Sequence, residues 1–356
     1  FRSTELNGLQ QSDLREWMQT INEPAFRGSQ LFTHFHKHGQ TDLSYITGFG
    51  EALRKKVAAN GRVDGAEIIR TLPAKNGRSI KYGLRLSDDR IVEAVFMRYP
   101  THNTLCISTQ VGCAMGCAFC ASTKDGLIRN LRTGEMTAQV YATERASGET
   151  IQNLVLMGIG EPLQNYTNTV AALRILHDPD GKGMSYRNIS LSTCGIVPNM
   201  RRLAEEDMPI NLVISLHAAN DRKRREIMPI AEHYTIQEVI AAADDYFEKT
   251  GRRISYEYTL IPGVNDTEND LKELIQLLKG RQAHVNLIAY HPIKEYQKTR
   301  PDATALQRFS ARLNAGGIRT TVRKSIGLEE QGACGQLRAQ ENRRQEVQYG
   351  NSDKNR

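Results

Sequence analysis

Apolar residues along the chain change their spacing, which separates an N-terminal part from a middle part. In residues 1–60 they recur at helical spacing, as at Leu14, Met18 and Ile21, which indicates a small helical bundle. Between 65 and 100 they alternate with polar residues or form β-branched runs, which are typical of short strands joined by turns. We therefore expect helices first and a small β region after them.

From about residue 104 a strand pattern alternates with a helix pattern. The predicted strands cover 104–109, 153–157, 187–192, 211–216, 254–260, 284–288 and 318–323. The predicted helices between them include 134–147, 167–177, 235–249, 268–279 and 303–315. Strands that alternate with helices form βαβ units and a parallel sheet, so we predict an α/β fold, a partial (β/α)6-type TIM barrel. Such folds bind ligands at the carboxyl ends of their strands.

These patterns define four expected regions of the chain. Residues 1–62 form a helical accessory domain, 63–100 a short β linker region and 101–337 the partial barrel. Residues 338–356 form a polar tail, whose composition is typical of a disordered segment.

Composition narrows the class of protein only slightly. The 356 residues include 47 Lys and Arg against 40 Asp and Glu, and the net charge is +7. This mild excess permits a polyanion such as RNA as a partner without identifying one. The chain has neither a run of about 18 apolar residues nor the apolar core of a secretory signal at its start, so we expect a cytoplasmic protein without a membrane partner.

Three of the six cysteines lie within eight residues, in Gly112-Cys113-Ala-Met-Gly-Cys117-Ala-Phe-Cys120. Clustered thiols in a cytosolic protein indicate metal binding or catalysis. An iron–sulfur cluster usually takes four cysteine ligands and this run supplies three, so either another cysteine is the fourth ligand or one iron is open to a small ligand. Zinc is the rival metal, but structural zinc prefers a second ligand pair, which the sequence lacks.

The spacing of these cysteines resembles that of the radical S-adenosylmethionine (SAM) superfamily. This resemblance implies a [4Fe-4S] cluster held by Cys113, Cys117 and Cys120, with the methionine part of SAM on the fourth iron. The segment Gly158-Ile-Gly160-Glu161-Pro162 follows a predicted strand, and in that superfamily the equivalent segment receives the amino group of SAM. Taken alone, the segment would be read as an ordinary turn between a strand and a helix.

Further motifs resemble those of the RlmN/Cfr family of RNA adenosine methyltransferases, and the RlmN type is the better match. The resemblance covers residues 10–340 or so. The motifs that carry it are Phe26-Arg27 with Gln30, Cys106-Ile-Ser-Thr-Gln-Val-Gly-Cys113, Arg129-Asn-Leu-Arg-Thr-Gly-Glu135, Met157-Gly-Ile-Gly-Glu161-Pro162, Ser192-Thr-Cys-Gly195, Ser215-Leu-His-Ala218, Met228-Pro-Ile230, Gly263-Val-Asn-Asp266 and Ala333-Cys-Gly-Gln-Leu337.

The family resemblance implies methylation of carbon 2 of an adenosine in 23S rRNA, and in tRNA, with two SAM molecules per turnover. One SAM methylates Cys334, and the radical made from the second takes a hydrogen from that S-methyl group. The carbon radical then adds to carbon 2, which is not nucleophilic and would not attack SAM directly. Cys106 attacks Cys334 to form a disulfide that frees the product. Glu93 falls at the family's proton-acceptor position.

The resemblance also implies further contacts and partners. It assigns SAM contacts to Gly160, Glu161, Ser192, Ser215, Leu216, His217 and His291. His291 replaces an asparagine of the family and can still donate or accept a hydrogen bond. The stretch 325–332 differs from the Asp-rich segment of the family. The helical domain is expected to bind RNA, and a flavodoxin-type protein is expected to donate electrons. Cys194 has no assigned role, so we expect a small core residue.

Three alternatives remain open at this point. The enzyme could methylate carbon 8, which is the Cfr-type reaction, or it could be a radical SAM enzyme that acts on another substrate, such as a protein activase. It could also be an iron–sulfur protein that binds RNA without catalysis. Basic pairs such as Arg201-Arg202 and the run 223–225 are candidate phosphate contacts, although each alone favours a solvated helix face. Three alternate histidines, at 34, 36 and 38, are expected at the surface or facing RNA.

Overall fold

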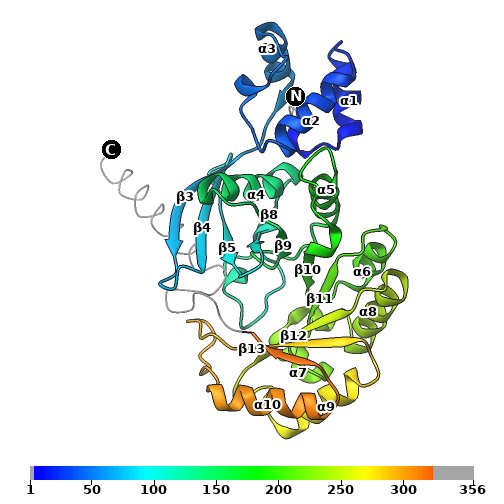
Figure 1. The fold of residues 1–356 in the computed structure, drawn as a ribbon. Helices are drawn as coiled ribbons and strands as arrows, with labels where there is room; N and C mark the ends of the chain where they lie inside the picture. Colours follow the sequence, from blue (N-terminus) through cyan, green and yellow to red (C-terminus); the bar gives the residue numbers. More distant parts are fainter. Residues whose placement is uncertain (1–3, 324–356) are drawn as a thin grey trace, which may run out of the picture.

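The computed structural model describes residues 4–323 of the chain (Figure 1). Cys334, the stretch 325–332 and the polar tail therefore lie outside the described residues. No helix in the described part of the chain is long and apolar enough to cross a lipid bilayer.

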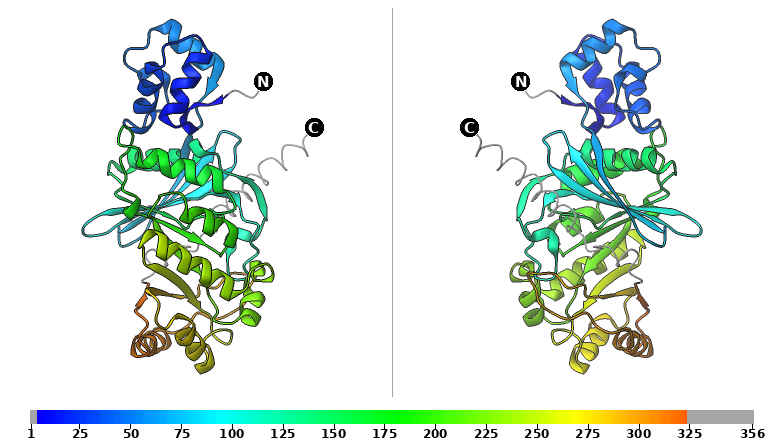
Figure 2. Two further views of the ribbon diagram at one scale, coloured as in Figure 1. Left: turned by 90° about the vertical axis from the view of Figure 1, so that its right-hand side faces the viewer. Right: turned by 90° about the vertical axis from the view of Figure 1, so that its left-hand side faces the viewer.

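The first part of the chain is helical, as its apolar spacing predicts. It contains α1 (Gln11–Thr20), α2 (Phe26–His36) and α3 (Glu51–Asn60), which stand at one end of the molecule (Figures 1 and 2). Their apolar faces form a hydrophobic cluster that is largely separate from the main core. Its members include Leu14, Trp17, Met18, Leu31, Phe32, Phe35 and Val57.

Two of the three alternate histidines are buried, which contradicts the predicted surface position. His36 lies 3.1 Å from the hydroxyl of Tyr141 on α4 (Thr133–Ser147), and His34 lies 3.0 Å from the carbonyl oxygen of Asp42. Helix α2 packs on α1 and also faces α4, so it buries more than one side. Burial lowers the pKa of His36 to about 3, which keeps the imidazole neutral. His38 is exposed as expected.

A ten-stranded sheet forms the centre of the molecule. Its parallel strands are β6 (Asn103–Cys106), β9 (Asn153–Leu156), β10 (Ile189–Thr193), β11 (Asn211–Ser215), β12 (Ile254–Leu260), β13 (Ala283–Ala289) and β14 (Thr320–Val322). They are adjacent in chain order, and a helix follows each from β6 to β13. Simple winding of this kind curves the sheet into the predicted partial barrel.

The three strands expected in the β linker region extend this same sheet. They are β3 (Ala66–Pro73), β4 (Ser79–Leu86) and β5 (Ile91–Arg98), and β5 pairs antiparallel with β6. The sequence predicts these strands but does not indicate that they join the barrel. Their position brings residues of the β linker region to the edge of the barrel, near the carboxyl ends of its parallel strands.

The helices that follow the parallel strands cover one face of the sheet. They are α4, α5 (Tyr166–His177), α6 (Val197–Ala204), α7 (Asp221–Ile227), α8 (Ile236–Thr250), α9 (Glu268–Leu278) and α10 (Ala303–Ala315). The five helices predicted from periodicity begin and end within one residue of the observed bounds. Sequence determines one of these starts clearly: Thr235 and Glu238 form a capping box at α8.

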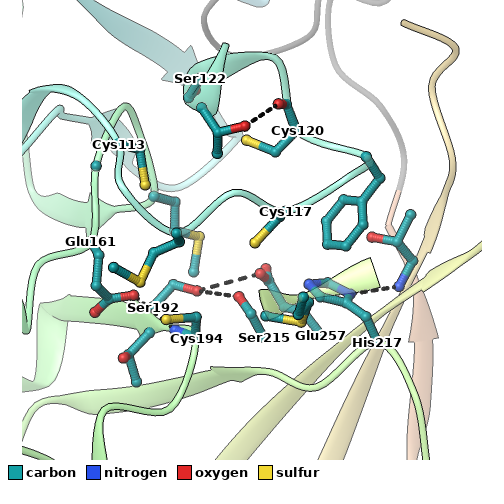
Figure 3. A pocket seen from close by; sticks show the side chains of 18 of the residues that line it. Cys113, Cys117, Cys120, Ser122, Glu161, Ser192, Cys194, Ser215, His217 and Glu257 are labelled. Carbon is teal, nitrogen blue, oxygen red and sulfur yellow. Dashed lines mark hydrogen bonds between the residues drawn. The ribbon is translucent and has the colours of Figure 1, made fainter. Parts of the chain in front are cut away.

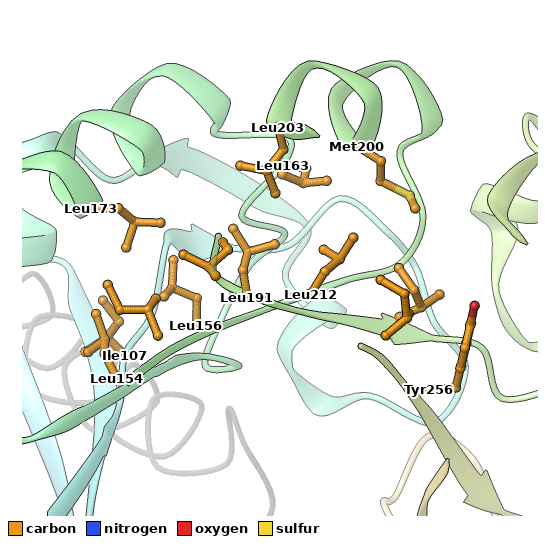
Figure 4. Packing of buried hydrophobic residues seen from close by; sticks show 14 of the residues in the cluster. Ile107, Leu154, Leu156, Leu163, Leu173, Leu191, Met200, Leu203, Leu212 and Tyr256 are labelled. Carbon is orange, nitrogen blue, oxygen red and sulfur yellow. The ribbon is translucent and has the colours of Figure 1, made fainter. Parts of the chain in front are cut away.

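Strand register separates an apolar face from a polar face. Leu156, Leu191 and Leu212 lie side by side on adjacent strands and pack under the helices (Figure 4). Because side chains alternate along a strand, Ser192 and Ser215 point to the opposite face. The polar face is the one that the helices leave uncovered, and it carries the site described next.

Candidate active site

The three clustered cysteines lie on a loop at the carboxyl ends of the barrel strands. Short strands β7 (Gln110–Gly112) and β8 (Leu127–Asn130) pair antiparallel and close the base of this loop. The backbone nitrogen of Cys113 donates to the carbonyl oxygen of Gly126 over 3.0 Å. Gly116 has a φ of +67°, and a Cβ there would lie 3.3 Å from the Pro229 ring. Glycine thus lets the loop turn closely against its neighbour.

All three cysteines line one cavity of about 270 Å³. Figure 3 shows the cysteine loop on one side of this cavity and the strand ends on the other. The cavity brings together eight of the predicted site residues: Cys113, Cys117, Cys120, Gly160, Glu161, Ser192, Ser215 and His217. They come from one loop and from three consecutive strand ends.

The three cysteine thiols line one cavity, so they fit an iron–sulfur cluster held by one thiolate on each of three irons. Within residues 4–323, no group of three His, Cys, Asp or Glu side chains is placed to share one ion. Burial raises the pKa of Cys113 to about 12 and raises that of Cys117 as well. Thiolates at these positions therefore require a cationic group beside them, as cluster iron would provide.

The Gly-Ile-Gly-Glu segment is held by specific contacts and is not an ordinary turn. Gly160 has a φ of +110°, and a Cβ there would lie 2.6 Å from the Cβ of Gln110. The side-chain oxygen of Gln110 accepts a hydrogen bond from the Glu161 backbone nitrogen over 2.8 Å. The Glu161 carboxylate accepts from the backbone nitrogens of Leu163 and Cys194 over 2.9 and 2.8 Å. Burial raises the pKa of Glu161, against these hydrogen bonds.

Two serines and a glutamate form a hydrogen-bonded row across three strand ends. The Oγ atoms of Ser192 and Ser215 lie 3.2 Å apart, and Ser192 donates to the Glu257 carboxylate over 3.4 Å (Figure 3). Register places Ser215 directly beside Glu257. Burial raises the pKa of Glu257, an effect opposed by the charge of Arg323 and by Ser192. Hydroxyl and carboxylate groups in this row can bind the polar groups of a ligand.

No motif in the sequence identifies Glu257. The available signal was an acidic residue between two tyrosines, Tyr256 and Tyr258, in a predicted strand. Tyr256 and Tyr258 point to the helix-covered face, so Glu257 points to the cavity.

His217 is a neutral imidazole at the end of β11. Its φ is +56°, and its Nδ1 accepts a hydrogen bond from the Thr259 backbone nitrogen over 3.0 Å. Because Nδ1 is the acceptor, we assign the proton to Nε2. Burial and the charge of Arg224 lower the pKa of His217 to about 3. The Phe119 ring of the cysteine loop packs edge-on against the imidazole, with centroids 4.7 Å apart.

Arg224 is fully buried, although the sequence placed it in a basic run expected on a solvated face. Its Nη2 donates to the carbonyl oxygen of Cys194 over 2.6 Å and to that of Ser215 over 3.3 Å. The guanidinium therefore ties together the ends of two strands below the cysteine loop. Cys194 is buried as expected, beside Ile227 and Met228, and it also lines the cavity.

Four predicted site residues are not among those that line the cavity, although all four are described. Glu93 and Cys106 lie on β5 and β6, where Ser108 Oγ donates to the Glu93 carbonyl oxygen over 2.7 Å. Leu216 is buried, and its backbone nitrogen donates to the Glu257 carbonyl oxygen over 3.1 Å. His291 lies in the loop after β13, where burial and then the charges of Arg300 and Lys81 lower its pKa.

The barrel and its cysteine loop define a radical SAM enzyme. A model of the Radical SAM superfamily matches residues 107–278, which include the cysteine loop and the strand ends. A solved radical SAM methyltransferase from Sphaerobacter thermophilus has the same fold, with a TM-score of 0.89 and 40% identity. The match covers 94% of this chain and 98% of that one.

The N-terminal helices and the whole-chain relatives identify the family within that class. Residues 4–63 match a model of the ribosomal RNA large subunit methyltransferase N-terminal domain. A probable dual-specificity RNA methyltransferase RlmN from Lachnoclostridium phytofermentans is 46% identical over 94% of both chains. Its counterpart from Clostridioides difficile is 44% identical over 94% of this chain and 97% of its own. The chain belongs to the RlmN family of RNA methyltransferases.

Proposed function

We propose that this RNA methyltransferase methylates carbon 2 of an adenosine in 23S rRNA and in tRNA. The observation that carries this proposal is the cavity, where three thiols face a row of polar strand-end groups. The thiols suit a [4Fe-4S] cluster and the polar row suits SAM, in a chain that belongs to an RNA methyltransferase family. The cluster and SAM, when bound, supply a 5′-deoxyadenosyl radical.

The residues around the cavity have distinct roles in this proposal. Cys113, Cys117 and Cys120 hold the cluster, and the Gly160–Glu161 segment receives the amino group of SAM. Ser192 and Ser215 contact its polar groups, and neutral His217 offers its Nε2 proton as a hydrogen-bond donor. Leu216 and His291 complete the proposed SAM contacts through the backbone and the imidazole.

The proposed reaction also uses Cys334, Cys106 and Glu93, which are not among the residues that line the cavity. Cys334, which lies outside the described residues, accepts a methyl group from one SAM. The radical derived from a second SAM then removes a hydrogen from that S-methyl group. The resulting carbon adds to carbon 2 of the adenine, and the adduct gives up one electron, which balances the electron used to cleave SAM. A tether of this kind holds the carbon against the base.

Release of the product requires a thiol and a base. The Cys106 thiolate attacks the Cys334 sulfur, so an S–S bond forms and the carbon–sulfur bond breaks, with its electron pair left on the adenine side. Glu93 accepts the carbon-2 proton, and the new methyl group takes a proton from solvent. An external reductant then returns two electrons to the disulfide. We propose a flavodoxin-type protein as the electron donor for the cluster.

The N-terminal helices supply the proposed RNA contacts. Phe26 and Tyr45 are 54% and 70% exposed, unlike most large apolar residues of the described chain. The Arg27 guanidinium lies 4.9 Å from the centroid of the Phe26 ring. Exposed aromatic rings beside a cation suit unpaired RNA bases.

We propose the divisions 1–62, 63–100, 101–337 and 338–356 for the domains and a cytoplasmic location for the protein.

One incubation tests the proposed activity. Reconstituted protein, SAM and reductant are mixed with unmodified 23S rRNA fragments or with unmodified tRNA, and the nucleosides are analysed by mass spectrometry with positional standards. We expect 2-methyladenosine from both RNAs. A product methylated at carbon 8 would overturn the assigned position, and cleavage of SAM without methylated RNA would overturn the substrate.

A further inference from the structure

We propose that Lys81 is a positioning residue for Glu93, whose carboxylate it holds at the barrel mouth and whose negative charge it balances. This inference rests on the proposed role of Glu93 as proton acceptor. The Lys81 Nζ lies 3.7 Å from the Glu93 Oε2. The Glu93 side chain is buried, with 4% exposure, and the Lys81 side chain is 10% exposed.

Strand register explains how the two side chains meet. Lys81 on β4 lies opposite Val95 on β5, and Gly83 lies opposite Glu93. Lys81 and Glu93 are therefore diagonal neighbours on the same face of an antiparallel pair, within reach of long side chains. Gly83 has no side chain, which leaves the position directly across from Glu93 open for the lysine to approach.

The same register places this ion pair beside the proposed release thiol. Val95 lies between Lys81 on one side and Cys106 on the other, so these three positions form one row across β4, β5 and β6. Glu93 lies two residues before Val95 and shares that face. It is level with Ser108, just beyond the end of β6, where the Ser108 hydroxyl donates to its carbonyl oxygen. The carboxylate thus lies toward the carboxyl ends of the barrel strands.

An ion pair with so little exposure to solvent contributes little to the stability of the fold, so its presence points to a function. Little of either charged side chain is exposed to solvent, 10% for Lys81 and 4% for Glu93. Buried ion pairs are often no more stabilising than apolar residues of the same volume. A buried carboxylate without a counter-charge favours its protonated form, which cannot accept a proton. Lys81 provides that counter-charge, and the proton removed from carbon 2 goes to a Glu93 oxygen while Lys81 keeps its own protons.

Lys81 also lies near His291, the residue that replaces an asparagine of the family. The charge of Lys81 lowers the pKa of His291, after burial and Arg300. Lys81 therefore lies close to both Glu93 and the loop after β13. A neutral imidazole at 291 adds no positive charge of its own near Lys81.

Substitution of Lys81 tests this inference in the full-length, reconstituted enzyme. The variants are Lys81→Met, Lys81→Arg, Glu93→Gln and the double variant Lys81→Met with Glu93→Gln. Lys182→Met is the matched control, because the Lys182 side chain is also 10% exposed and pairs with a carboxylate, that of Glu144. Three quantities are measured: the rate of RNA methylation, the covalent protein–RNA adduct on denaturing gels, and the S-methylation of Cys334 by peptide mass spectrometry.

We expect Lys81→Met to slow RNA methylation by about a hundredfold, the effect of a misplaced catalytic group. Cys334 still gains its methyl group, and the adduct accumulates because the carbon-2 proton is not removed. Lys81→Arg restores most of the rate. The double variant and Glu93→Gln methylate RNA at rates that agree within about twofold, because both changes act on one step. Lys182→Met leaves the adduct level unchanged.

A normal methylation rate in Lys81→Met would overturn the role of Lys81. So would a double variant in which Lys81→Met slows Glu93→Gln by as much as it slows the unmodified enzyme. Absence of the methyl group on Cys334 in Lys81→Met would also overturn it, since the defect would then precede the proton transfer. A normal rate without adduct in Glu93→Gln itself would instead refute the proposed role of Glu93. The two failures are therefore distinguishable.

Discussion

The Glu161 carboxylate accepts a hydrogen bond of 2.8 Å from the backbone nitrogen of Cys194, so it joins the loop after β9 to the loop after β10. Its other oxygen accepts from Leu163 over 2.9 Å. The side chains of Thr193 and Cys194 also hydrogen-bond to this carboxylate, and Glu161 lines the cavity. One side chain thus orders two strand ends and presents a carboxylate to the cavity.

Replacement of Glu161 by Gln should affect both functions. The amide must turn its NH2 group toward one of the two backbone N–H donors, which leaves that donor unpaired in a buried place. We expect a loss of about 1–3 kcal/mol in the free energy of unfolding and weaker binding of SAM. Urea unfolding and equilibrium dialysis of SAM with the reconstituted protein measure the two effects. Unchanged unfolding with unchanged SAM affinity would show that the contacts are dispensable.

Removal of a cluster thiol should abolish iron binding without unfolding the chain. Cys117→Ala removes one of the three proposed ligands, so we expect reconstituted protein to lose most of its iron and the visible absorption of the cluster. Cys194→Ala is the control, because Cys194 lines the same cavity but is assigned to the core. We expect it to keep its iron. Equal iron loss in both variants would contradict the ligand assignment.

Regular elements of the barrel follow from local sequence, but their assembly does not. The predicted strand 254–260 and the predicted helix 303–315 have the observed bounds, because burial on one side imposes a clear period. The union of β5 with β6 is a tertiary pairing between a predicted linker region and the barrel, and neither strand shows its partner in its own sequence. The partial barrel was predicted, and its antiparallel extension was not.

The candidate site divides in the same way. Three cysteines within eight residues and the Gly-Ile-Gly-Glu segment are local motifs, so the sequence predicts their chemistry. Arg224 stands between two other basic residues, and its complete burial depends on carbonyl oxygens from two strand ends. The pairing of Lys81 with Glu93 depends on strand register. Such contacts between distant segments cannot be read from spacing along the chain.

Glu257 should contribute to SAM binding although no motif identifies it. Its half-buried carboxylate accepts from Ser192 and lines the cavity, so it can also receive hydroxyl groups of a ligand. We expect Glu257→Gln to weaken SAM binding by about tenfold, the equivalent of one charge-assisted hydrogen bond. Dialysis of labelled SAM with the reconstituted protein provides the measurement. Glu248→Gln, at an exposed position on α8, should leave the affinity unchanged. Equal affinities for the Glu257 variant and the unmodified enzyme would exclude the contact.

Glu5 should make the stability of the protein depend on pH. Its carboxylate accepts a hydrogen bond of 2.7 Å from the Gly134 backbone nitrogen, where the N-terminal region meets the start of α4. Burial, and then the charge of Asp64, raise the pKa of Glu5 from 4.5 to about 7. The folded chain therefore holds this proton more tightly than the unfolded chain. The resulting stabilisation is complete below pH 4.5 and is lost as the pH rises through about 7.

Glu5→Gln tests this dependence, because the amide oxygen can still accept from Gly134 while no proton is exchanged. We expect the unmodified protein to lose on the order of 2 kcal/mol more stability than the variant between mildly acidic and mildly alkaline pH. Urea unfolding at several pH values gives the two curves, and Glu16→Gln, at an exposed position on α1, should follow the unmodified protein. Parallel curves for Glu5→Gln and the unmodified chain would mean that Glu5 exchanges no proton on folding in this range. A steeper curve for Glu5→Gln would reverse the sign of the effect and contradict the raised pKa.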